Sequence, residues 1–285
     1  MPGVSKSLTR ADGFSLVPPT ECLLSATWDY SMTGEELADA ARVSRYLVYK
    51  HEPPFPPRTY EEIKSTFHSG LLALQVIKPL RTLGIVFYGH CIGSSRFSLE
   101  CIERRPPMEP YSWALKRTFD RELVKAAPSV IESVLRIMMG PSAERRNAFL
   151  LLQLGLEHFH PLIAGLLWVM GLEAILNSAN RNDFKEKICA RLGPSTRVFP
   201  DWHGPQPDAT VDEIAIDLYT LRSKLAHGVD LRKAASDPRF PVDLFEKRDL
   251  PNSPDPVPYA LLLSEAACYL LCQLLLKEIA SLARD

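Results

Sequence analysis

The chain has 285 residues, of which 46% are hydrophobic and 24% are charged, and its formal net charge is −1. This hydrophobic content is ample for a sizeable core and indicates one large domain or two modest ones. A net charge so close to zero excludes a global electrostatic attraction to nucleic acid or to a membrane, so a nucleic-acid partner would need a local basic patch.

Two capping boxes predict the first helices. One pairs Thr33 with Glu36 and predicts a helix that ends before a run of prolines. The other pairs Thr59 with Glu62 and predicts a helix that reaches about Ile77. The residues before the first box, 1–30, are expected to be irregular.

A β-hairpin is predicted next, because two β-like runs, 84–88 and 96–101, flank a segment rich in turn residues. All of the expected β-structure lies in the first half of the chain. We therefore interpret residues 1–140 as a small α+β region, to which the sequence assigns no role.

The second half of the chain is expected to be helical throughout. Pro128 should break the first of its helices. The segment 161–178 is apolar on nearly every side, which predicts a central helix and the most buried one. The fold class is therefore mainly α, with a helical bundle over residues 141–285. The helices are expected at 119–139, 142–159, 161–178, 183–192, 211–227 and 259–282.

The sequence gives no sign of export or of a membrane span. The segment MPGVSKSLTRADGF lacks the apolar stretch of a signal peptide. Charged residues interrupt the two most apolar segments, 149–179 and 258–276, so neither offers the roughly 20 clean residues that a span needs. The six cysteines form no CxxC pair, which favours free thiols. We expect a cytoplasmic protein that does not contact membranes.

Arg222 is the first candidate for a functional role. It lies one turn after Leu218 and one turn before Leu225, at the edge of the apolar face of its predicted helix. A guanidinium at such a place is costly to bury without a partner. Glu173 is the only ionisable residue in the helix predicted for 161–178, so it is the expected partner, within salt-bridge distance.

His227 ends the same predicted helix, and a helix C-terminus stabilises a positively charged imidazolium. Ser223 lies one turn earlier and can share its face. Arg222 and His227, five residues apart, point about 140° away from each other on an ideal helix. One chain therefore brings them together only if the last turn loosens; otherwise a second copy must supply one of them.

The run LYTLRSKLAHG, residues 218–228, resembles the R-x4-H helix of the HEPN superfamily, and is most similar to its Apea-like branch. The segment LLWVMGLEAILNS, residues 166–178, is similar to the core helix of that branch, with Glu173 at its acidic position. The resemblance covers the helical order of about 142–282 and is specific over the two short motifs. Residues 1–110 resemble no family.

This resemblance implies a bundle that dimerises and places two Arg-His helices in a composite cleft. It also implies an endoribonuclease that needs neither a metal nor another cofactor, with RNA as its partner. His227 would be the acid–base residue and Arg222 the phosphate clamp, with Glu173 orienting Arg222. The supporting residues would be Ser223, Tyr219 and Lys224. Apart from the resemblance, the basic pair Arg232-Lys233 follows this helix closely and Lys224 lies on it, which allows a local basic patch that attracts phosphate. A role in phage defence, as a toxin, or in a stress response follows by analogy, with a protein trigger or antitoxin not identified by the sequence.

Two positions depart from the wider pattern. Ser223 stands where the superfamily often has Asn, Asp or His, although serine fits the Apea-like branch. Val229 stands where toxins controlled by a nucleotidyltransferase antitoxin carry a tyrosine, so control by that modification is not expected.

Other interpretations remain open from the sequence. The chain could be a non-catalytic HEPN-type module that binds a nucleotide, a nucleic acid or a protein, or a plain helical dimerisation protein with Arg222 in an interface salt bridge. His158 and His160 lack further ligands at suitable spacing, so no metal site is predicted. The aromatic segment 199–204 is either a lid, an RNA-stacking element, or a loop held by one buried tryptophan.

Overall fold

The computed structural model describes residues 14–17, 33, 46–49, 59–77, 85–92, 96–104, 121–158, 160–198, 209–227, 246–248 and 257–282. The chain divides into two units, one made of residues 1–108 and 118–136, the other of residues 109–117 and 137–285. Among the described residues helix predominates, so the prediction of a mainly α fold is confirmed at that level.

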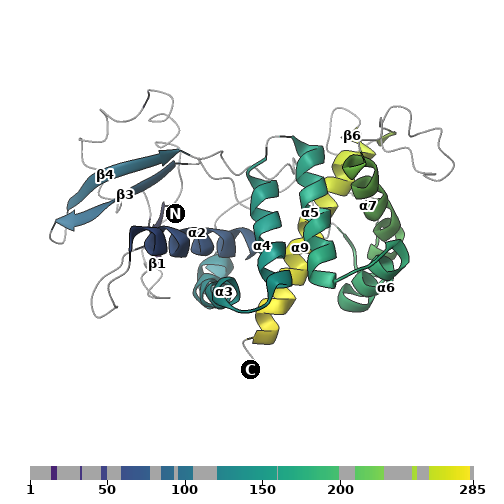
Figure 1. The fold of residues 1–285 in the computed structure, drawn as a ribbon, viewed down its shortest axis with the longest axis horizontal. Helices are drawn as coiled ribbons and strands as arrows, with labels where there is room; N and C mark the ends of the chain where they lie inside the picture. The colour runs from purple at the N-terminus through teal and green to yellow at the C-terminus, as the bar shows by residue number, and fades with distance from the viewer. Residues whose placement is uncertain are drawn as a thin grey trace. The chain divides into compact units, whose positions relative to one another are not determined.

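The described residues of the first unit form two antiparallel strand pairs and two helices. Strand β1 (Phe14–Val17) pairs with β2 (Tyr46–Tyr49), and β3 (Ile85–Ile92) pairs with β4 (Arg96–Arg104). The helices are α2 (Tyr60–Ile77) and most of α3 (Arg121–Met139). Figure 1 shows the long β3–β4 hairpin and the helix α2.

The structure confirms the capping box and the β-hairpin predicted for this unit. The capping box at the start of α2 is confirmed, because the Thr59 N–H donates to Glu62 Oε2 over 2.7 Å and the Glu62 N–H donates back to the Thr59 hydroxyl over 3.3 Å. The hairpin is confirmed as well, but β3 is longer than predicted, since a register shift after Tyr88 lets Gly89 stay in the strand. The helix expected after Thr33 lies outside the described residues.

Two expectations for this unit were wrong. Residues 14–17 form a strand instead of irregular chain, because Phe14 packs against α2 at Gly70, where a side chain would clash with the phenyl ring. Helix α3 continues through Pro128 without a break. Burial of the apolar stripe Ala127, Ile131 and Val134 offsets the roughly 3 kcal/mol that an interior proline costs.

The described residues of the second unit form a bundle of five helices with a short strand pair, so the expectation that all β-structure lies in the first half of the chain was wrong. The helices are α4 (Ala143–Leu156), α5 (Pro161–Leu176), α6 (Arg181–Leu192), α7 (Val211–Ala226) and α9 (Tyr259–Leu282), and the strands are β5 (Lys247–Arg248) and β6 (Val257–Pro258). Helix α5 packs against α4, α6, α7 and α9, so its predicted central position is confirmed.

The prediction that α5 is the most buried helix was wrong. Helix α9 buries 14 of its 24 residues, whereas α5 buries 8 of its 16. Close packing of α5 on α9 depends on Gly165 and Gly171, where an added Cβ would overlap Ser264 and would lie 2.7 Å from Leu271 Cδ2. The opposite side of α5 leaves Ile163 and Met170 exposed.

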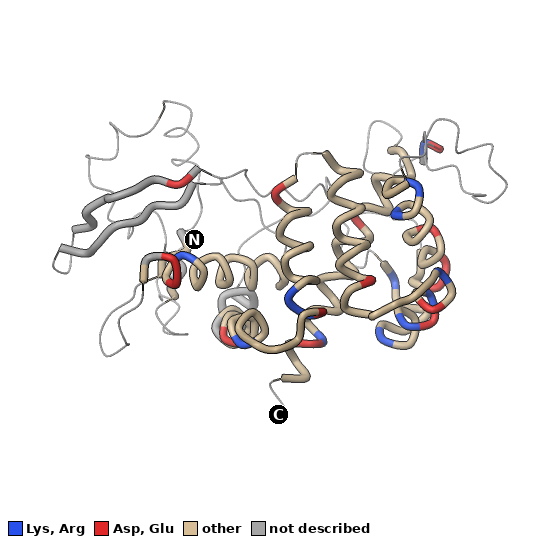
Figure 2. The backbone as a smooth tube through the Cα atoms, viewed as in Figure 1, with Lys and Arg blue, Asp and Glu red and all other residues tan. Residues whose placement is uncertain are grey.

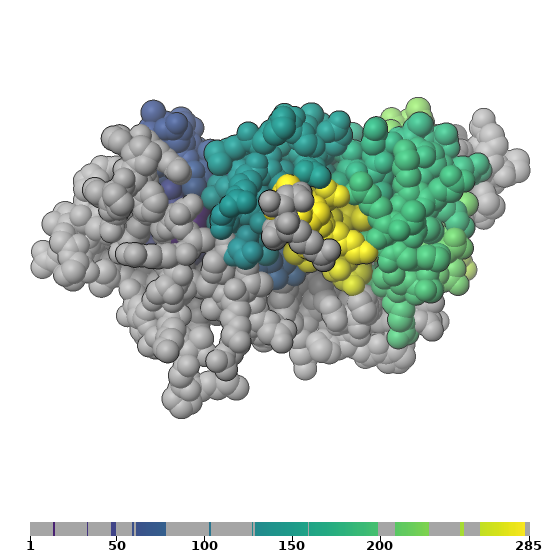
Figure 3. Space-filling model, turned by 90° about the horizontal axis from the view of Figure 1, so that it is seen from below, coloured from purple at the N-terminus to yellow at the C-terminus, as the bar shows by residue number. Residues whose placement is uncertain are grey.

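Ionic contacts join three helices at one end of the bundle. Glu278 of α9 accepts hydrogen bonds from Arg145 of α4 over 2.8 Å and from Arg191 of α6 over 2.6 Å. Figure 3 shows α9 in yellow between α4 in teal and α6 in green on this face. Elsewhere the charged residues gather on α6 and α7, whereas α5 carries only Glu173 (Figure 2).

Helix α9 is long and apolar enough to cross a membrane by length and composition, contrary to the expectation that its charged residue Glu265 leaves too few clean apolar residues for a span. However, 72% of its most apolar stretch is buried inside the structure, as in the core helix of many bundles. In the part of the chain that the structure describes, no other single helix passes the same test, although the bent pair α5 and α6 does so together.

Candidate functional site

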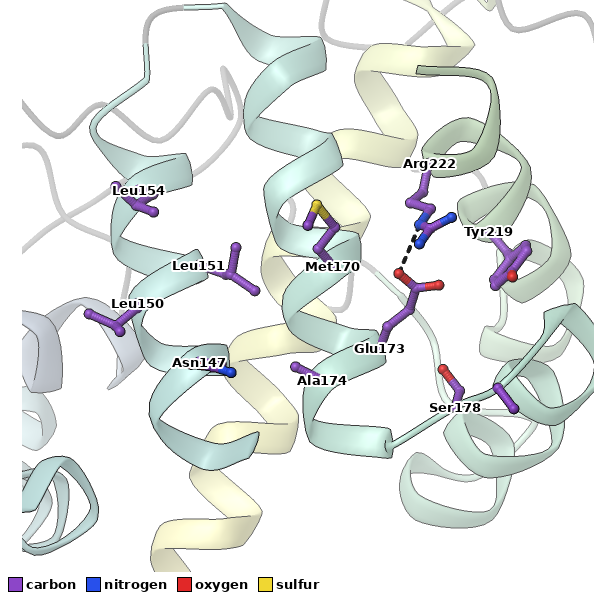
Figure 4. A pocket seen from close by; sticks show the side chains of 11 residues that line it. Asn147, Leu150, Leu151, Leu154, Met170, Glu173, Ala174, Ser178, Tyr219 and Arg222 are labelled. Atoms are coloured by element: carbon purple, nitrogen blue, oxygen red, sulfur yellow. Dashed lines mark hydrogen bonds and ion pairs between the residues drawn. The ribbon is translucent and has the colours of Figure 1, made fainter. Parts of the chain in front are cut away.

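The structure brings Arg222 and Glu173 together. Arg222 lies on α7, whose first turn is fixed where the Thr210 N–H donates to Glu213 over 2.8 Å and whose core face buries Ile214, Leu218 and Leu221. The Arg222 Nε donates to Glu173 Oε2 over 2.9 Å (Figure 4). The predicted ion pair is therefore confirmed, and it links α7 to α5.

The pair lies on the wall of an open groove of about 560 Å³. This volume falls within the roughly 300–1,000 Å³ typical of small-molecule sites. Helices α4, α5 and α7 and the turn between α5 and α6 form its walls. The lining residues are Asn147, Leu150, Leu151, Leu154, Met170, Glu173, Ala174, Ser178, Ala179, Tyr219 and Arg222.

Three groups in this groove keep unused hydrogen-bonding capacity. Within the described residues, the two terminal nitrogens of Arg222 and the Oε1 atom of Glu173 make no hydrogen bond, since the pair uses only Nε and Oε2. The Ser178 hydroxyl is buried and has no partner. Of the three, only the Ser178 hydroxyl is buried without a partner, and an unpaired buried polar group costs about 1–3 kcal/mol. The Arg222 nitrogens and Glu173 Oε1 belong to partly exposed side chains and are available to water or to a polar ligand.

Glu173 and Arg222 differ in burial, and this difference affects the pKa of the carboxyl. Glu173 is the more buried side chain, with 15% of its surface exposed against 30% for Arg222. Burial raises the pKa of the Glu173 carboxyl above its usual range, and the Arg222 guanidinium offsets only part of that rise. The Tyr219 ring, whose centroid lies 5.8 Å from the guanidinium carbon, adds a cation–π contact on the side of α7.

His227 lies outside the groove. It caps the C-terminus of α7, where its N–H donates to the Ser223 carbonyl over 3.1 Å. Its side chain is exposed and makes no hydrogen bond to the described residues. The groove therefore unites Arg222, Glu173 and Tyr219 but does not include His227, in keeping with the wide angle between positions 222 and 227 on a helix.

Two of the expected supporting residues do not line the groove. Ser223 is half-buried on the neighbouring side of α7. Lys224 is only 1% exposed, so the expectation that it contributes to an exposed basic patch was wrong. Its spacing explains this burial, because it follows the buried residues Thr220 and Leu221 by one turn. The loop 199–204 and the basic pair 232–233 lie outside the described residues.

Sequence reasoning missed the other side of the groove. Leu150, Leu154 and Met170 are large apolar residues that are between 38% and 51% exposed, and Ser178 follows the end of α5. The sequence did contain one signal for this wall. Helix α5 is apolar on every side, and its neighbours in the bundle leave one of its apolar faces, with Met170, uncovered. Among the described residues, no three His, Cys, Asp or Glu side chains gather as metal ligands would.

No family model, no curated protein and no solved structure matches this chain. The resemblance to HEPN proteins therefore rests on the residues of its two motifs alone.

We expect the two halves of the ion pair to contribute differently to stability. Arg222→Ala should lower the free energy of unfolding more than Glu173→Gln, because it leaves a mostly buried carboxylate without its cation. The loss should fall between the roughly 1 kcal/mol of exposed pairs and the roughly 3–5 kcal/mol of buried ones. Glutamine leaves a partly exposed guanidinium that water still solvates.

The pH dependence has a definite sign. A carboxyl whose pKa is higher in the folded than in the unfolded protein stabilises the fold at low pH, and this stabilisation is lost as the pH rises through the folded pKa. Arg222→Ala raises that pKa further, so its deficit should be small near about pH 4.5 and largest near about pH 8. Urea unfolding at a series of pH values measures this. A deficit that does not change with pH, or a larger loss for Glu173→Gln, would contradict the assignment.

Proposed function

We propose that this protein is a metal-independent endoribonuclease of HEPN type. One observation carries the proposal: Glu173 holds Arg222 by Nε, which leaves both terminal nitrogens of the guanidinium without a hydrogen bond to the described residues, on a side chain that lines an open groove. A phosphate clamp needs such free nitrogens, because they donate hydrogen bonds to the oxygens of a phosphate. The positive charge of the guanidinium also stabilises the negative charge that builds on those oxygens in the transition state.

The reaction requires two proton transfers. One proton leaves the ribose 2′-hydroxyl as its oxygen attacks phosphorus, and one is delivered to the 5′-oxygen as its bond to phosphorus breaks. The products are a 2′,3′-cyclic phosphate and a free 5′-hydroxyl. An exposed imidazole suits this chemistry, and the resemblance assigns the acid–base role to His227, with Tyr219 and Ser223 in support.

We propose a homodimer as the active form. Arg222 lines the groove and His227 does not, so a twofold axis that brings the two copies of α7 together would let one chain supply the guanidinium and its partner the imidazole. A molar mass in solution equal to that of one chain, about 32.0 kDa, would contradict this arrangement.

The test uses purified protein, labelled RNA and matched DNA in the presence of EDTA. RNA should be cleaved to products that end in a 2′,3′-cyclic phosphate. DNA should remain intact because it lacks the 2′-hydroxyl nucleophile. Loss of RNA cleavage on adding EDTA, or cleavage of DNA at a similar rate, would contradict the proposed chemistry.

A second function is favoured by a different observation. The groove has both polar and apolar walls without any contribution from His227. A non-catalytic module that binds a nucleotide, a nucleic acid or a protein would need such a groove and no acid–base residue. In that case the His227→Ala protein would keep the full cellular effect of the wild type. For the nuclease, by analogy with HEPN proteins, we place the activity in the cytoplasm, in a phage-defence or stress response.

A further inference from the structure

The groove contains a proton acceptor that is closer to the phosphate clamp than His227 is. Glu173 contacts Arg222 directly, over 2.9 Å, so its free Oε1 lies beside the nitrogens that would hold a phosphate. His227 is absent from the groove lining. A base for the 2′-hydroxyl must lie next to the phosphate, because that hydroxyl and the 3′-phosphate are on adjacent carbons of the ribose.

The remaining walls fit the other parts of a ribonucleotide. Leucines of α4 and Met170 of α5 form an apolar surface on one side, and Figure 4 shows them across from Arg222 and Glu173. A nucleobase can pack its flat face against such a surface. The Ser178 hydroxyl, buried and without a partner, lies on the side of Glu173, where a sugar would supply hydrogen-bonding groups.

We propose that Glu173 is the general base of the reaction and that the groove binds the nucleotide on the 5′ side of the cleaved bond. This rests on the proposed ribonuclease function and divides its two proton transfers between two residues. Arg222 binds the 3′-phosphate of that nucleotide, Glu173 Oε1 accepts the hydrogen bond of the 2′-hydroxyl, and the base lies against Leu151, Leu154 and Met170.

The 2′-hydroxyl proton moves to Glu173, the bond from O2′ to phosphorus forms, the bond from phosphorus to O5′ breaks, and His227 of the partner chain donates its proton to O5′. Water then removes the proton from Glu173 and restores that of His227. An acid and a base on opposite sides of phosphorus are what in-line displacement requires, and an imidazolium at a helix C-terminus suits the acid.

The surroundings of Glu173 support this role. Its carboxyl is mostly buried and keeps its acceptor free, and burial raises its pKa, which makes it a stronger base than an exposed glutamate. The charged and titratable groups around it are few. Arg222 and Tyr219 of α7 share the groove, Lys187 and Asp183 of α6 pair with each other at the end of α5, and α4 adds no charged residue to the lining.

The kinetic test compares full-length wild type with Glu173→Gln, which keeps the shape of the side chain and an oxygen for Arg222 Nε. We expect kcat for RNA cleavage to fall about 10²- to 10⁴-fold with little change in KM, and the acid limb of the pH–rate profile to disappear. A residue that only positions Arg222 would leave that limb in place. Retention of the limb, or of the wild-type rate, in Glu173→Gln overturns the proposal while the ribonuclease function stands.

The second measurement needs no catalysis and uses 3′-AMP and its 2′-deoxy analogue as probes. Wild type should bind 3′-AMP roughly tenfold more tightly, because the lost hydroxyl removes a hydrogen bond to a charged group. Leu154→Asp should lose this binding, whereas Ile163→Asp, at a similarly exposed apolar residue outside the groove, should keep it. Equal binding of the two probes, or no binding, overturns the proposal. Ribose-selective binding without RNA cleavage by wild type overturns both the general base and the nuclease, and supports the binding module.

Discussion

Replacing His227 with alanine is expected to abolish RNA cleavage while the protein stays folded. The loss in kcat should be about 10²- to 10⁴-fold, the usual contribution of a general acid or base. The effect on stability should be only about 0.3–2 kcal/mol, since the imidazole is exposed and interacts with little beyond the end of α7. Labelled RNA incubated in EDTA measures the first effect, and thermal unfolding followed by circular dichroism measures the second.

Two outcomes would contradict the expected result for His227→Ala. Equal cleavage by wild type and His227→Ala would indicate a contaminating nuclease and would remove His227 from the site. Cleavage by neither protein, over several structured and unstructured RNAs, would favour the non-catalytic binding module. Arg222→Ala is the less suitable variant for this purpose, because it also removes the cation beside the buried carboxylate of Glu173.

A mixture of Arg222→Ala and His227→Ala chains tests whether the site is shared between two chains. Arg222→Ala and His227→Ala should each be inactive alone. When they are unfolded together and refolded as a mixture, half of the dimers contain both chains, and one of the two sites in such a dimer is intact. Activity should then recover to about one quarter of the wild-type value. No recovery, despite normal dimerisation, would contradict a site built from two chains.

Replacing Trp168 with alanine is expected to give the largest loss of stability in the bundle. Trp168 of α5 is 1% exposed, and its indole N–H donates to the Leu152 carbonyl of α4 over 3.3 Å. Truncation leaves a cavity between the two helices that form the groove, which should lower the free energy of unfolding by about 3–5 kcal/mol. Urea unfolding measures the loss. A change of less than about 1 kcal/mol would contradict the packing.

Gly155 supplies the matched control for that variant. An added Cβ there would lie 2.7 Å from the Trp168 ring carbon Cδ1, so Gly155→Ala should destabilise the wild type by about 1–3 kcal/mol. In the Trp168→Ala background the clash is gone, and the same change should stabilise α4 by about 0.5–1 kcal/mol, as alanine in place of glycine normally does in a helix. Stabilisation of the wild type by Gly155→Ala would show that the two helices lie further apart.

The sequence alone determined much of the local structure. Hydrophobic spacing and the capping box of α2 predicted most of the helices to within a few residues, because both signals act within one or two turns. It also predicted the pairing of Arg222 with Glu173. That inference needed no geometry, since Glu173 is the only ionisable residue of α5 and a guanidinium on the apolar edge of α7 needs a counterion.

The tertiary structure decided which helix faces are covered. Periodicity indicates that a face is apolar but not which element packs on it, so the sequence could not place the uncovered leucines of α4 and Met170 of α5 beside the ion pair. For the same reason it ranked α5 above α9 in burial. Lys224 was expected to contribute to a basic patch, whereas its position one turn after Leu221 puts it on the buried face of α7.

For the candidate site, too, the sequence predicted the residues and the tertiary structure decided which of them lie together. The sequence named Arg222, Glu173, Tyr219 and His227, because residue type and spacing are enough to suggest a phosphate clamp and an acid–base group. Only the packing of α4, α5 and α7 showed that the first three share a groove, that Ser178 completes one wall of it, and that His227 lies outside. Such groupings join positions up to 75 residues apart, from Asn147 to Arg222, and depend on the contacts between helices, which no local sequence pattern encodes.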